Sequence, residues 1–70
     1  MVDVPAHITG TVWKIEKKPG DAVSAGDVLV ILESMKMEMP VEAEDPGVVK
    51  EIVVEEGQSV SEGDTLVVLE

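Results

Sequence analysis

The sequence predicts an all-β fold, a flattened barrel or sandwich of eight short strands. Three observations support this prediction. Valine, whose branched side chain favours strands, dominates the apolar residues. No stretch shows the pattern of a helix of ten or more residues between chain breakers. The chain also repeats itself at an offset of 37 positions. With only 70 residues, it forms one domain, residues 1–70.

The repeat sets the architecture. Residues 2–33 align without a gap on residues 39–70, and 14 of the 32 aligned positions are identical. Two copies are too few for a solenoid, which needs at least three stacked repeats. We therefore expect two halves related by a pseudo-two-fold axis, with four strands in each half. Each half is too small to fold alone and closes the core of the other.

Gly10 precedes the first strand in which apolar and polar residues alternate regularly. Gly47 begins the equivalent strand of the second copy. Residues 11–16 alternate between apolar and polar side chains, which is the pattern of a half-buried strand. We expect Val12, and to a lesser degree Ile15, to point inward.

The most apolar runs, residues 28–32 and 65–69, are short and rich in β-branched side chains, as buried strands are. Each follows a Gly-Asp turn, at positions 26–27 and 63–64. Because the chain has a single aromatic residue, we expect a core of Val, Ile, Leu, Ala and Met.

Composition excludes several functions. Fifteen acidic residues against five lysines give a net charge of −10, which argues against nucleic-acid binding and against docking on an anionic membrane. The longest apolar run is far shorter than a membrane span, and the N-terminus lacks the pattern of a signal peptide. Cysteine chemistry is absent because there is no cysteine. We expect a soluble, cytoplasmic protein.

A short join, residues 34–38, separates the two repeats at a hairpin position. It carries Lys36, and three of the four methionines, Met35, Met37 and Met39, cluster around this lysine. A two-residue type I′ turn prefers Asn-Gly, so Met35 and Lys36 would occupy a sparsely populated region with φ > 0. A broken local rule of this kind is expected at functional sites.

The plainer interpretation is an ordinary lysine on a polar turn between core methionines. The position of the join weighs against it, because residues 34–38 lie at the symmetry point and have no counterpart elsewhere in the chain. Methionine at an exposed turn is also unusual, unless its flexible apolar surface is used for recognition.

The segment from Glu33 to Pro40, Glu-Ser-Met-Lys-Met-Glu-Met-Pro, resembles the attachment motif of biotinyl carrier domains. The resemblance extends over essentially the whole chain and includes the Gly-Thr-Val-Trp-Lys stretch at residues 10–14. It implies a barrel-sandwich hybrid of two four-stranded antiparallel sheets, with biotin amide-linked to Lys36 on an exposed hairpin. By the same resemblance, a biotin ligase would recognise the residues around this lysine: Glu33, Ser34, Met35, Met37 and Glu38.

The chain departs from the family in two places. Ser34 stands where the family often has Ala or Val, and the ungapped repeat leaves no room for the protruding thumb of some carriers. The resemblance implies a non-enzymatic biotin carrier that serves biotin carboxylase and carboxyltransferase subunits or domains. A cleft, a nucleophile–base pair and a metal cluster are all missing from the sequence pattern.

Two alternatives stay open. A lipoyl carrier of an oxo-acid dehydrogenase-type complex has a similar architecture, but its lysine is usually flanked by Asp and Ala, so lipoate is the less expected cofactor. The other alternative is an unmodified adaptor domain, like the hairpin modules of membrane-fusion proteins.

The remaining residues favour structural roles. The acids are concentrated after Lys36, either as solvated turns or as a surface that steers docking onto basic partners. His7 has no second histidine nearby and is expected at the surface. Trp13 aligns with Lys50 in the other half, so we expect it to face outward or to lie at a rim.

Overall fold

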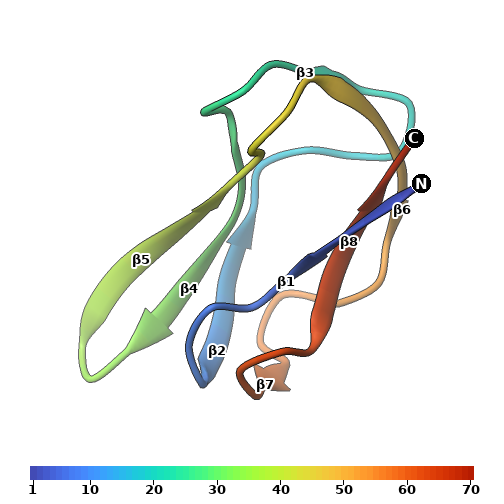
Figure 1. Ribbon diagram of the computed structural model, residues 1–70. Helices are drawn as coiled ribbons and strands as arrows, with labels where there is room; N and C mark the ends of the chain where they lie inside the picture. The colour runs from blue at the N-terminus through green and yellow to red at the C-terminus, as the bar shows by residue number, and fades with distance from the viewer.

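The computed structural model describes all residues from 1 to 70, and every regular element in it is a strand (Figure 1). No helix of the length and apolarity needed to cross a membrane is present. The eight strands are β1 (Val2–Pro5), β2 (Gly10–Ile15), β3 (Ala22–Val23), β4 (Val28–Ser34), β5 (Met37–Glu42), β6 (Gly47–Ile52), β7 (Ser59–Val60) and β8 (Thr65–Leu69).

The strands form two four-stranded sheets, one in the order β1-β8-β6-β3 and the other in the order β5-β4-β2-β7. All neighbouring strands are antiparallel. A shift of 37 residues exchanges the two sheets, because β1 to β4 of one copy take the places of β5 to β8 of the other. The predicted fold class is confirmed.

Each half completes the other through equivalent backbone hydrogen bonds. The Val12 N–H donates to the Gln58 carbonyl at 2.8 Å, and the Val49 N–H donates to the Asp21 carbonyl at 2.9 Å. These two bonds are related by the same 37-residue shift. They cross between the halves, so neither half can satisfy its backbone alone.

The core contains fourteen buried residues, all of them Val, Leu or Ala. The side chains without any exposed surface are those of Leu29, Val30, Leu32, Leu66 and Val67. Isoleucine contributes at the margin of the core, where Ile8, Ile15 and Ile52 pack against it half-buried. The expectation of buried methionine is wrong, because no methionine is among the fourteen buried residues and Met1, Met35 and Met37 are exposed.

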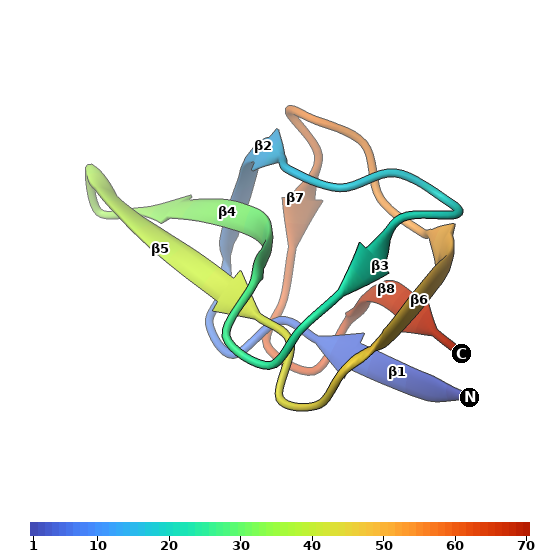
Figure 2. The same ribbon diagram turned by 90° about the horizontal axis from the view of Figure 1, so that it is seen from above.

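The β4–β5 hairpin extends out of the body of the molecule, whereas both chain ends lie at the opposite side (Figures 1 and 2). The molecule measures 30 × 19 × 17 Å. Gly10 lies against β4 close to the turn of the hairpin, because a Cβ on this residue would meet the Glu33 carbonyl oxygen at 2.5 Å. The close approach of β2 to β4 at this point therefore requires glycine.

Candidate functional site: the β4–β5 hairpin

The turn of the hairpin consists of two residues, Met35 and Lys36. Ser34 and Met37 pair directly across the hairpin and close the turn. Met35 has φ 53° and Lys36 has φ 64°, and these are the only non-glycine residues with positive φ. A type I′ turn has positive φ at both central residues. The strain that the sequence predicted at this spot is present.

Both residues of the turn are exposed to solvent. The side chains of Met35 and Met37 are 91% and 59% exposed, and Lys36 is exposed between them. The Lys36 amine has no hydrogen bond and no ion pair. Because nothing in the chain holds this amine, another protein can reach it without breaking an existing contact.

The strands below the turn place Ser34, Glu33 and Glu38. Ser34 is half-buried and shares a face with Met37, the face whose next pairs lead into the core. Glu33 and Glu38 are exposed and lie directly opposite each other on the outward face. Like charges directly opposite in a sheet are unfavourable, and neither carboxylate has an ion-pair partner. Both carboxylates are therefore exposed to solvent without a counter-charge from the chain.

The sequence analysis named Glu33 and Glu38 but did not predict that they lie directly opposite each other on paired strands. The signal was present, because a two-residue turn at positions 35–36 fixes the register and pairs 33 with 38. The structure thus brings all of the expected recognition residues to one end of the molecule: Glu33, Ser34, Met35, Met37 and Glu38.

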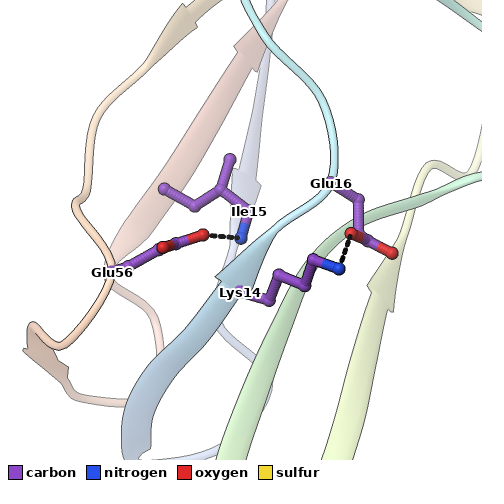
Figure 3. A network of polar contacts seen from close by, with 4 residues as sticks. All are labelled: Lys14, Ile15, Glu16 and Glu56. Atoms are coloured by element: carbon purple, nitrogen blue, oxygen red, sulfur yellow. Dashed lines mark hydrogen bonds and ion pairs between the residues drawn. The ribbon is translucent and has the colours of Figure 1, made fainter.

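Several of the acidic residues serve local structure. Figure 3 shows the Lys14 Nζ paired with Glu16 Oε1 at 3.5 Å, and the Ile15 N–H donating to Glu56 Oε2 at 3.1 Å. In the two Gly-Asp turns, Asp27 and Asp64 each accept a 2.8 Å hydrogen bond from the backbone N–H three residues earlier. These carboxylates build turns and cap an open strand edge, so the total charge overstates the acid available for docking.

Two other sequence expectations concern residues away from the turn. His7 is exposed, as expected, and lines an open cavity of about 590 Å³ between β1, the β5–β6 loop and the C-terminus. The structure contains no group of three or more residues that could hold a metal ion. Trp13 is 47% exposed and occupies a bulge of β2, which confirms its outward position.

The model of the biotin/lipoyl family, described as "Biotin-requiring enzyme", matches residues 1–69. A relative named "Biotinylated protein TB7.3 homolog" from Mycobacterium leprae is 54% identical over 41 residues, which cover 59% of this chain and 58% of the relative. The chain therefore spans somewhat more than half of this curated relative.

Solved structures match almost the whole chain. The urea carboxylase of Kluyveromyces lactis superimposes with a TM-score of 0.93 and 38% identity, covering 99% of this chain and 6% of that enzyme. The lipoyl domain of the 2-oxoglutarate dehydrogenase complex from Azotobacter vinelandii superimposes with a TM-score of 0.82 and 38% identity, covering 100% of this chain and 96% of that domain. The chain belongs to the biotin/lipoyl family of attachment carrier domains, whose biotinylated members carry biotin covalently.

Proposed function

We propose that this protein is a biotin carrier and that biotin is linked through an amide to the Nζ of Lys36. The observation that carries the proposal is the position of this amine. It lies on an exposed, strained two-residue turn at the tip of the protruding hairpin, in a chain of the biotin/lipoyl family. Lys36 suits a covalent link to biotin, because its amine has no hydrogen bond or ion pair within the chain and is exposed to solvent.

Attachment requires little from the carrier itself. An ammonium cannot attack, so Lys36 must lose a proton inside the site of a biotin ligase. The neutral amine then attacks the activated carboxyl carbon of biotinyl adenylate, the new C–N bond forms, and AMP leaves. The rigid sheets present the turn in one geometry, which lowers the ordering cost of docking on the ligase.

We assign recognition by the ligase to the residues that frame Lys36. Met35 and Met37 offer flexible apolar side chains for apolar pockets. Glu33 and Glu38 offer a pair of carboxylates for a cationic group. Ser34 supports the turn from the inner face.

When attached, biotin supplies a ureido nitrogen that carries a carboxyl group between two active sites. The carrier would then serve a biotin carboxylase and a carboxyltransferase, and the covalent link would raise the effective concentration at both. In this proposal residues 1–70 act as one domain, with halves 2–33 and 39–70 around the hairpin 34–38. We also propose that it works in the cytoplasm.

A lipoyl carrier is the second candidate function, and the close superposition on a lipoyl domain favours it. The two methionines beside Lys36 favour biotin. Incubation with lipoate and a lipoate ligase in place of biotin and its ligase separates the two. We expect modification with biotin to be faster by at least tenfold.

The test is incubation of the purified protein with biotin ligase, ATP and biotin, followed by a streptavidin blot. The wild type and Lys50→Arg, an exposed lysine on the other sheet, should bind streptavidin equally. Lys36→Arg keeps the charge and should bind none. Streptavidin binding that persists in Lys36→Arg would refute the proposal.

A further inference from the structure

The outward face of the sheet that carries the hairpin has a strip of apolar side chains, with exposed residues at its two ends and the half-buried Ile31 between them. Ile31 lies directly opposite Lys14 on β2 and Pro40 on β5, so these three share the outward face. Trp13 is the extra residue of the β2 bulge and precedes Lys14, with 47% of its surface exposed. Bulges commonly redirect a side chain near a functional site. We refer to Trp13, Ile31 and Pro40 as the outer strip.

The second copy provides an internal control for this strip. The residues equivalent to Trp13, Ile31 and Pro40 on the other sheet are Lys50, Val68 and Asp3. The register is also equivalent, because Val68 pairs with both Glu51 and Asp3. A cation and a carboxylate thus replace the apolar residues at both ends of the strip. The fold therefore does not require an apolar strip at these positions.

The strip leads to the opposed carboxylates of Glu33 and Glu38. Ile31 and Pro40 form the outward-facing pair next to Glu33 and Glu38 on the same hairpin. An apolar strip that ends at two carboxylates without ion-pair partners suits an apolar surface with an arginine at its edge, because arginine binds carboxylates through two parallel hydrogen bonds.

We propose that the outer strip docks this protein onto the biotin carboxylase, through an apolar surface of that enzyme that carries an arginine. This inference rests on the proposed function. A ligase acts at the turn itself, where the methionines and carboxylates around Lys36 are within reach. A carboxylase receives the far end of a long flexible arm, so contacts on the rigid body of the carrier, away from Lys36, are needed to hold the domain in place.

The test uses Trp13→Lys, because the second copy already carries lysine at the equivalent place and the fold tolerates it. Lys50→Ala is the matched control on the other sheet. Each variant is first biotinylated at Lys36 and checked by streptavidin, then offered to biotin carboxylase with Mg-ATP and bicarbonate. We expect biotinylation within about twofold of wild type for both variants. We also expect the KM for the carrier to rise about tenfold in Trp13→Lys only, as for an aromatic interface anchor.

A second measurement does not depend on activity. Trp13 is the only tryptophan, so a fluorinated indole gives one ¹⁹F resonance. That resonance should shift when biotin carboxylase is added to the biotinylated carrier, and should not shift with the ligase. An unchanged KM in Trp13→Lys, or an equal loss of biotinylation and carboxylation, would overturn the inference. Failure of wild-type biotinylation would instead refute the proposed function.

Discussion

Met35 and Lys36 have a backbone conformation that side chains of their type rarely adopt, and this conformation points the lysine away from the protein. Positive φ costs a non-glycine residue roughly 1–2 kcal/mol. Asn or Gly would form the same turn without this cost. The sequence allowed this conflict to be predicted, because neither residue type is present at a hairpin position. We therefore propose that recognition, rather than stability, determines the residue before Lys36.

The first prediction follows from this conflict. Met35→Asn should raise the free energy of unfolding by about 0.5–1 kcal/mol, because asparagine tolerates positive φ. The same variant should be biotinylated more slowly, because it loses an apolar side chain that is 91% exposed. Thermal unfolding gives the first quantity, and the initial rate with biotin ligase gives the second. A lower melting temperature, or an unchanged rate, would contradict this reading of the turn.

Among the strands, the position of the hairpin depends on how closely β2 approaches β4 near the turn. The alternation of residues 11–16 predicted β2, but the bulge between Val12 and Lys14 was not predictable, since it appears only when β2 pairs with β4. The same limit applies to methionine. Its hydrophobicity suggested the core, whereas the register places Met37 on a part of β5 that extends past the core. Local patterns predict strands, and pairing decides which side chains are covered.

Gly10 provides the second prediction. In Gly10→Ala the new Cβ would meet the Glu33 carbonyl oxygen at 2.5 Å, so β4 must shift close to the turn of the hairpin. We expect a loss of about 1–3 kcal/mol in unfolding free energy, and slower biotinylation. Gly47→Ala is the matched control on the other sheet, because its Cβ would meet the Glu70 carbonyl oxygen at the longer distance of 2.9 Å. Equal destabilisation of the two variants, measured by urea denaturation, would argue against this role.

At the scale of the molecule, duplication makes one cooperative unit from two halves. The backbone bonds from Val12 to Gln58 and from Val49 to Asp21 cross between the copies, and the buried residues form one cluster. The ungapped repeat was sufficient to predict this architecture from the sequence. It was also sufficient to identify residues 34–38 as the segment that breaks the symmetry. The outward faces differ between the copies because packing does not constrain them.

The third prediction tests this cooperativity. Leu29 and Leu66 are equivalent, and both are completely buried. Leu29→Ala and Leu66→Ala should each lower the unfolding free energy by about 2–5 kcal/mol, which is a large part of the stability of so small a domain. Fluorescence of Trp13, in the first half, and far-UV circular dichroism should give coincident transitions for both variants. Separate transitions would show that the halves unfold independently.

This fold exposes Lys36 at the tip of its hairpin, where we propose that a biotin ligase modifies it. The most direct measurement is peptide mapping by mass spectrometry after incubation with biotin ligase, ATP and biotin. The chain has five lysines, at positions 14, 17, 18, 36 and 50, and they serve as internal controls for one another. We predict a single biotinyl group, on Lys36, with the other four lysines unmodified. Biotin on any of those four, or a chain that a competent ligase leaves unmodified, would contradict the account.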